Sequence, residues 1–221
     1  MNKKKIFKFI GIVLIIIIVI FLIHSIRNYL IITNLQNKVS KYQNDTNYGI
    51  KSVATESNGT VINMEYYKKE NKEAVFLERN LNGEITKISV YNNGERVDTF
   101  FDTPEGKIAQ LNSGSIMGVN IYNMTETDSK WQTFLGSITA NIKSTNYNGK
   151  ECYVIKGFLS TYSLNFKGSE TYIDKETGLF VKTIEEERII ERNYVFDNID
   201  DNIFVEPDIG QYTLKKWKLK K

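Results

Sequence analysis

The sequence offers few residues that could act as a catalytic base or nucleophile. Its only histidine is His24 and its only cysteine is Cys152. A Ser-His-Asp or Cys-His arrangement needs a histidine beside the nucleophile, whereas His24 directly follows a long apolar run. Cys152 lies in a predicted strand and is typical of a small buried hydrophobe. Zinc sites built from histidines or from several thiolates are excluded as well.

The acidic residues form no convergent site either. Glu185–Glu187 are consecutive, and consecutive strand residues point to opposite faces of a sheet. The aspartates within 197–201 miss the spacing of a calcium loop and indicate a solvated turn. The sequence contains no Walker loop and no Gly-x-Gly-x-x-Gly motif. We therefore expect no enzyme, no cofactor and no metal site, and the function must be one of binding.

The location of the chain relative to a membrane is indicated by the apolar run Ile6 to Ile23, which is interrupted only by Lys8. As a helix it is ~27 Å long, close to the ~30 Å hydrocarbon core of a bilayer. No small-x-small pair follows it, so we expect an uncleaved anchor, with a cleaved signal peptide as the alternative. Lys3–Lys5 and Lys8 lie before the run or in its first turn, and only Arg27 follows closely. They predict a cytoplasmic N-terminus and an extracellular C-terminal domain in a single-pass protein of the cell membrane.

Although the net charge is +3, the central part of the chain, which we call the acidic body, carries a net negative charge. Five cations up to Arg27 and five lysines after Leu214 account for +10, which leaves residues 28–214 at −7. Nucleic acids need clustered cations, so the acidic body argues against a nucleic-acid partner. A single cysteine allows no internal disulfide, and the domain must be held together by packing.

Apolar residues in 28–45 recur at helical spacing. This helix is predicted either to continue the anchor helix or to be a second helix. The apolar stripe is too short to favour a coiled coil. After them, Asn-Gly dipeptides and other turn signals recur every ~10–12 residues and predict hairpins. The expected strands cover 46–57, 60–69, 73–80, 84–92, 95–102, 107–112, 139–146, 150–158, 168–174, 179–187 and 188–197.

The stretch 113–138 breaks this rhythm, and Trp131, Phe134, Leu135 and Ile138 recur at helical spacing. One interpretation is a helix that closes the open face of the sheet. The other is a lid whose Met and aromatic side chains shape an apolar pocket. The residues expected to line such a pocket are Met64, Phe76, Met117, Trp131 and Phe134, and their alternative role is ordinary core.

The order of these elements, with the stretches Tyr172–Gly178 and Phe204–Asp208, resembles the lipoprotein-carrier superfamily of LolA, LolB and RseB, in its membrane-anchored form from Gram-positive, clostridial-type bacteria. The resemblance covers residues ~28–212. It implies a strongly curved antiparallel half-barrel of about eleven strands, with helices over a concave side that accepts acyl chains or peptides. The shuttling carriers are soluble, so shuttling between two membranes is not implied for an anchored chain.

Together these features predict a cytoplasmic tip and transmembrane anchor (1–27), a juxtamembrane helix (28–45), a LolA-like β domain (46–212) and a basic tail (213–221). The expected function is an extracytoplasmic, membrane-anchored binding module for a lipid, a lipoprotein or an apolar peptide. The alternative is a regulatory or sensor protein of the cell envelope that acts through a membrane partner protein, and a structural envelope factor is a third. The tail is either a disordered solubilising end or an adhesive for anionic lipid or wall polymer through Lys215, Lys216, Trp217, Lys218, Lys220 and Lys221.

Overall fold

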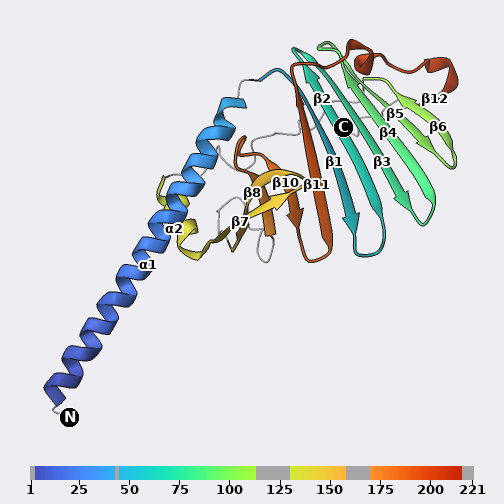
Figure 1. Cartoon of the computed structure of the whole chain (residues 1–221). Coiled ribbons are helices and arrows are strands. Elements are labelled where there is room, and N and C mark those ends of the chain that lie inside the picture. The colour runs from blue at the N-terminus through green and yellow to red at the C-terminus, as the bar shows by residue number, and fades with distance from the viewer. Residues whose placement is uncertain (1–2, 43–44, 113–129, 158–169, 216–221) are drawn as a thin grey trace, which may run out of the picture. The chain divides into compact units, whose positions relative to one another are not determined.

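The computed structural model describes residues 3–42, 45–112, 130–157 and 170–215. Its first six strands are β1 (Asn47–Glu56), β2 (Val61–Lys69), β3 (Lys72–Leu81), β4 (Glu84–Asn92), β5 (Val97–Thr103) and β6 (Gly106–Gln110). The others are β7 (Asn141–Tyr147), β8 (Lys150–Lys156), β9 (Glu170–Asp174), β10 (Phe180–Ile184), β11 (Arg188–Phe196) and β12 (Thr213–Leu214). Helix α1 (Lys3–Val39) precedes them, α2 (Lys130–Thr139) lies between β6 and β7, and the short 3-10 helices are η1 (Ser40–Tyr42), η3 (Asp201–Phe204) and η4 (Ile209–Gln211) (Figure 1).

The strands form one unclosed sheet in the order β12-β6-β5-β4-β3-β2-β1-β11-β10-β9-β8-β7. Strands β1 to β6 pair antiparallel in succession, whereas β12 pairs with β6 in parallel. The predicted fold class, a mainly β chain after one N-terminal apolar helix, is confirmed. The described sheet has twelve strands rather than about eleven, because Thr213 and Leu214 of the predicted tail pair with Ile108 and Ala109.

The chain divides into two compact units. The first comprises Met1–Ser40 with Tyr122–Leu179, and the second comprises Lys41–Ile121 with Phe180–Lys221. The stretch 46–212, predicted as one β domain, contributes to both units. Each unit therefore needs residues that lie far apart in the sequence.

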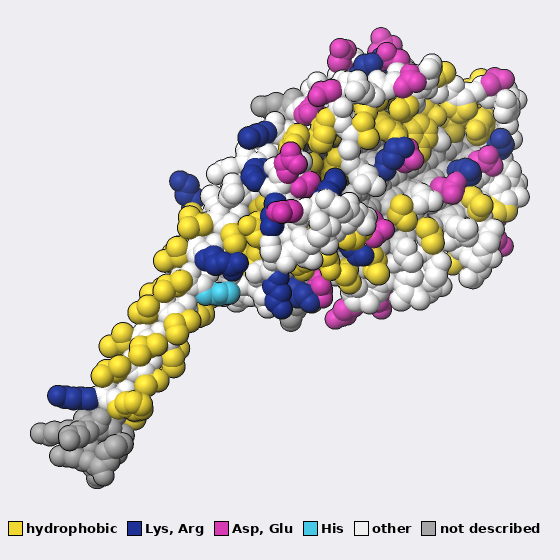
Figure 2. Space-filling model, in the orientation of Figure 1, with side chains coloured by type: hydrophobic (Ala, Val, Ile, Leu, Met, Phe, Trp, Pro, Cys, Tyr) yellow, Lys and Arg dark blue, Asp and Glu magenta, His cyan; other side chains and the backbone are white. Residues whose placement is uncertain are grey.

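Helix α1 is continuous over 37 residues, so the predicted juxtamembrane helix is a continuation of the apolar one. It is long and apolar enough to cross a membrane, with a mean hydropathy of 3.2 over its most apolar 18 residues. From Phe7 to Ile23 its apolar side chains are exposed (Figure 2). From Ser25 onward one stripe becomes buried at three- and four-residue steps, namely Ser25, Asn28, Ile32, Leu35 and Val39.

In the first unit this stripe packs against α2 and a hairpin. Asn28 Nδ2 donates to the carbonyl oxygens of Ser137 (3.1 Å) and Ala140 (2.6 Å), at the end of α2 where carbonyl groups lack helical partners. The hairpin between β9 and β10 contains Gly178 at φ +77°, where a Cβ atom would lie only 2.5 Å from the Leu35 carbonyl oxygen. Lys38 donates to the Lys175 carbonyl oxygen in the same hairpin. Close packing on the helix backbone therefore requires glycine at this turn.

The second unit is a meander whose register follows from its tight turns. Asn82 (φ +54°) and Gly83 (φ +91°) both have the positive φ of a type I′ turn, so Leu81 pairs with Glu84. Because side chains alternate along each strand and paired residues share a face, the register assigns every residue of β1–β6 to one of two faces. We call them the apolar face, which bears Met64 and Leu77, and the charged face, which bears Glu78 and Lys87.

The C-terminal segment packs on the charged face. Ile203, Phe204 and Tyr212 lie against a buried cluster of Ala74, Tyr91, Phe100 and Ala109. A series of edge-to-face ring contacts joins Tyr67, Phe76, Tyr91, Phe100 and Tyr212, with centroids 5.1–6.2 Å apart. Asp98, whose side chain is fully buried, pairs with Arg96 at 2.7 Å, and Arg96 also reaches Glu206 at 3.1 Å. This aromatic cluster thus lies on the charged face, whereas Tyr48, Ile50 and Tyr66 are buried on the apolar face.

Candidate binding surface

A continuous row of apolar side chains crosses five strands on the apolar face. Its members are joined pairwise by the register: Met64, Leu77, Ile88, Phe101 and Ile108. With ~4.8 Å between neighbouring strands, the four steps of this row, which we call the apolar row, span ~19 Å. The parallel row beside it continues the apolar character with Ile50, Tyr66, Val75 and Val90.

All five members of the apolar row are partly exposed. The described C-terminal segment packs on the charged face and not on the apolar row, while Ile50, Ser52 and Tyr66 beside the row are buried. Apolar surface of this kind gains roughly 25 cal/mol per Å² when a partner removes it from water. The row is therefore a candidate surface for an extended apolar ligand.

One end of the apolar face is polar. Tyr66 is almost fully buried and its hydroxyl donates to Glu73 Oε1 at 2.8 Å, while Asn92 Nδ2 donates to Glu73 Oε2 at 3.0 Å. Burial, and then the hydrogen bond to Glu73, raise the pKa of Tyr66. Both carboxylate oxygens of Glu73 are thus satisfied within the protein, and this cluster closes the apolar face at the end of β2.

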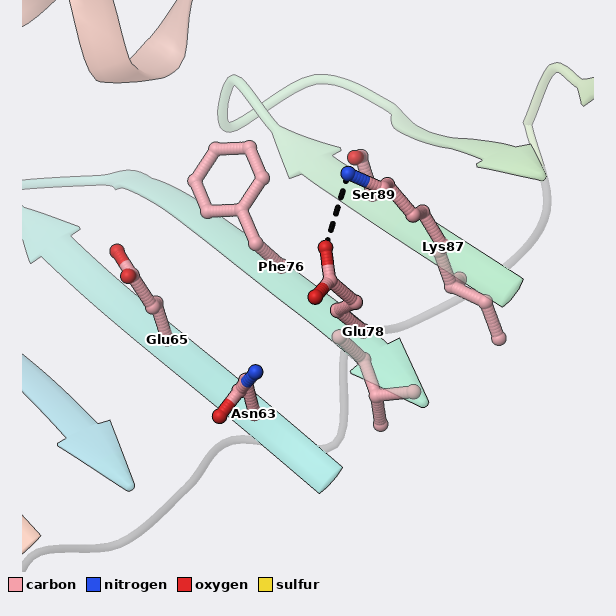
Figure 3. A pocket seen from close by; sticks show the side chains of 8 residues that line it. Asn63, Glu65, Phe76, Glu78, Lys87 and Ser89 are labelled. Atoms are coloured by element: carbon pink, nitrogen blue, oxygen red, sulfur yellow. Dashed lines mark ion pairs between the residues drawn. The ribbon is translucent and has the colours of Figure 1, made fainter. Parts of the chain in front are cut away.

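The charged face carries a shallow hollow of about 360 Å³. Figure 3 shows Phe76 within it, with Asn63 and Glu65 on β2 and Glu78 beside Lys87. Its cationic and acidic side chains are paired: Lys87 with Glu78 at 2.9 Å, and Lys51 with Glu65 at 3.4 Å. The hydrogen bond and charge of Lys87 lower the pKa of Glu78. Because these charges already satisfy one another, the hollow has the character of a solvated sheet face.

The predicted pocket residues do not come together as one set. Met64 is paired with Leu77 on the apolar face, whereas Phe76 is paired with Glu65 on the charged face. The register therefore places these two side chains on opposite faces of the sheet. Phe76 belongs to the aromatic core, the alternative role considered for it, and Met64 remains on the candidate surface.

The remaining predicted pocket residues belong to other parts of the chain. Trp131 and Phe134 are on α2 in the first unit, with their rings stacked 5.7 Å apart, and Phe134 also contacts Tyr29. The Trp131 side chain is 65% exposed. Met117 lies outside the described residues. Of the predicted tail, Lys215 donates its backbone N–H to the Ala109 carbonyl oxygen, and residues 216–221 are likewise outside the described part.

Sequence patterns alone contained a signal for the apolar row. A two-residue turn at Glu70 and Asn71 pairs Lys69 with Lys72, and this sets Met64 opposite Leu77. The turn at Asn82 and Gly83 then sets Leu77 opposite Ile88. Following the turn lengths in this way would have found the whole row.

The histidine and the cysteine, the two residues that could take part in catalysis, are both engaged in packing or hydrogen bonding. His24 Nε2 lies 3.0 Å from Asn28 Nδ2 and 3.3 Å from the Ala140 carbonyl oxygen. Cys152 is fully buried, and burial raises the pKa of its thiol. Among the described residues, no group of three or more His, Cys, Asp and Glu side chains is placed to hold a metal ion.

No family model matches this sequence, and no curated protein matches it. Among solved structures it is similar to a domain described as an outer membrane lipoprotein-sorting protein from Vibrio parahaemolyticus. That pair has 11% identity and a TM-score of 0.27 over 78% of this chain and 95% of the other. It is also similar to a LolA superfamily protein from Nitrosomonas europaea, with 9% identity, a TM-score of 0.22, and 79% and 97% coverage. The second neighbour is described as a member of the superfamily that the sequence resembles.

Proposed function

We propose that this protein is a membrane-anchored binding module whose apolar face takes an acyl chain of a lipid or lipoprotein, or an apolar peptide. The observation that supports this most directly is the apolar row, which remains partly exposed across five strands while the C-terminal segment covers the opposite face. A soluble domain gains nothing from such a row unless a partner removes it from water.

We further propose that α1 is an uncleaved anchor, with a cytoplasmic N-terminus and both units outside the cell. Its exposed apolar part runs directly into the buried stripe that begins at Ser25. Cleavage just after the apolar run would leave Asn28, which bonds Ser137 and Ala140, in the first turn of a frayed helix end. Retention of the anchor therefore also preserves the packing of the first unit.

Catalysis is not part of this proposal. His24 is occupied by contacts with Asn28 and Ala140, and a buried thiol with a raised pKa is a poor nucleophile. The binding surface itself consists of aliphatic and aromatic side chains, which exclude water but transfer no protons.

The test is native mass spectrometry of the full chain, purified in a non-ionic detergent, to detect a retained lipid or peptide. Replacement of Leu77 and Ile88 by Asn should abolish retention, because both lie in the middle of the apolar row. The matched control is Val53→Asn, since Val53 is an exposed apolar residue on the charged face of β1. If nothing is retained, or if the control behaves like the double variant, the proposal is wrong.

A regulatory role through a membrane partner is the second candidate. It is favoured by the continuity of α1, which extends from the apolar run into the first unit without a break. A partner that contacts the exposed run Phe7–Ile23 would thereby act on a helix that is packed within this unit. Photo-crosslinking from Leu14, which is exposed, should then capture one specific membrane protein in cells. Capture of lipid alone would contradict it.

For the tail we propose adhesion to anionic lipid or wall polymer, at ~1 kcal/mol per basic residue near the surface. A peptide of residues 213–221 should leave anionic vesicles when the salt concentration is raised. Binding that does not change with salt would contradict this role.

A further inference from the structure

Two arginine side chains flank the apolar row. Arg79 is two residues beyond Leu77 on β3 and therefore shares its face. Arg192 on β11 is paired with Ser52, which is paired in turn with Met64 at the end of the row. By register they are the charged residues of the apolar face that lie nearest to the row, and both are cationic.

Neither arginine forms an ion pair within the part of the chain that the structure describes. Arg192 Nη1 lies 3.3 Å from the Thr183 hydroxyl, and Arg79 is exposed. The acidic residues of this face are four positions away from the row along their strands. Two of them already accept hydrogen bonds, Glu73 from Tyr66 and Asn92, and Glu56 from Asn58.

On the charged face, several cations are matched to acids. Cross-strand ion pairs join Lys51 to Glu65, Lys87 to Glu78, and Lys107 to Asp102. A further pair joins Lys182 of β10 to Glu191 of β11 at 3.3 Å. Among the described residues, Arg79 and Arg192 are thus unmatched cations beside the apolar row, and Lys68 lies four positions from Met64 on the same face, although residues 28–214 are acidic as a whole.

The positions between the two arginines belong to β1 and β2. Ser52 is paired with Arg192 and with Met64, and Ala54 is paired with Ile190 and with Ile62, which is paired with Arg79. Guanidinium groups bind phosphate or carboxylate oxygens in a bidentate way.

From this arrangement we infer that the ligand of the apolar face is an anionic phospholipid. Its acyl chain lies along the apolar row and its phosphate is bound by Arg79 and Arg192. This inference rests on the proposed function and names its ligand class. The acidic body does not attract anions in general, so selectivity must come from these two side chains.

The test uses the full chain in non-ionic detergent and two lipids with identical acyl chains, phosphatidylglycerol and phosphatidylcholine. Native mass spectrometry should show a preference of about tenfold for phosphatidylglycerol, corresponding to ~1.4 kcal/mol. In the double variant Arg79→Gln/Arg192→Gln the two lipids should bind to within about twofold of each other, because only neutral side chains then face the head group. The matched control Lys87→Gln/Lys107→Gln removes the same charge from the charged face and should keep the preference.

The outcomes separate the two proposals. If both lipids bind equally to the unaltered chain, and Leu77→Asn/Ile88→Asn abolishes the binding, the module binds lipid but the head-group inference is wrong. A preference that survives in Arg79→Gln/Arg192→Gln would place the anion elsewhere, for example at the basic tail, and would also overturn the inference. Competition by inorganic phosphate, without any effect of the Leu77→Asn/Ile88→Asn change, would indicate a simple anion site. Absence of all lipid binding contradicts both proposals.

Discussion

The side chains of Met64 and Phe76 lie on opposite faces of the same strand pair, because Met64 is paired with Leu77 and Phe76 with Glu65. This one-residue difference in register separates a surface that is open to a ligand from the aromatic core. The two residues are similar in hydrophobicity, yet they have different neighbours: Phe76 contacts the rings of Tyr67 and Tyr91. Their substitution should therefore have opposite consequences.

We expect Phe76→Ala to lower the free energy of unfolding by about 2–3 kcal/mol, since it removes a partly buried ring from the core. Met64→Ala should cost less, about 1 kcal/mol, but should weaken lipid retention, which Phe76→Ala should not impair in the folded protein. Thermal unfolding and native mass spectrometry of both variants test this. Equal effects in both assays would show that the two faces are not distinct in function.

Some of this arrangement was predictable from the sequence. The Asn-Gly dipeptides and the spacing of turns placed eleven strands close to their observed bounds, because such turns dictate local geometry. Strand bounds alone leave open which face Met64 and Phe76 occupy, and the pairing that decides it depends on the exact length of each turn. The return of Ile203, Phe204 and Tyr212 onto the charged face could not be predicted, since these contacts depend on tertiary packing between distant segments.

Gly178 should tolerate no side chain. Gly178→Ala places a Cβ 2.5 Å from the Leu35 carbonyl oxygen in addition to the strain of a positive φ, and we expect a loss of more than about 2 kcal/mol. The control is Gly59→Ala, because Gly59 has a similar φ of +84° and an added Cβ would meet no atom within 4 Å. It should cost only about 1 kcal/mol. If chemical unfolding shows equal losses, the contact between the hairpin and α1 contributes nothing.

Arg96 should hold the C-terminal segment in place. Its loss in Arg96→Ala leaves the buried Asp98 carboxylate, among the described residues, with the backbone N–H of Asn112 as its remaining donor and frees Glu206. An uncompensated buried charge costs about 3 kcal/mol, so limited proteolysis should cleave the segment after Phe196 more readily. The control Lys87→Ala breaks an exposed pair with Glu78 and should change stability by less than about 1 kcal/mol. Unchanged proteolysis of Arg96→Ala would show that packing alone retains the segment.

The stability of the second unit should fall at alkaline pH. Burial raises the pKa of Tyr194 to about 12, and its hydroxyl donates to the Phe180 carbonyl oxygen at 2.8 Å. The unfolded chain releases this proton near pH ~10 while the folded chain still holds it, so the folded state binds more protons between ~10 and ~12 and loses stability as the pH rises. One such group accounts for at most about 2–3 kcal/mol.

Tyr194→Phe should remove this share of the pH dependence. The variant loses one hydrogen bond, about 1 kcal/mol, and is therefore less stable than the unaltered chain at pH 8. Above pH ~10 its stability should fall less steeply, so the two curves converge. Burial also raises the pKa of Tyr48, Tyr66, Tyr67 and Tyr91, and a residual slope should remain. Urea unfolding at pH 8, 9, 10 and 11 measures both slopes, and parallel curves would show that Tyr194 ionises no later in the folded chain than in the unfolded one.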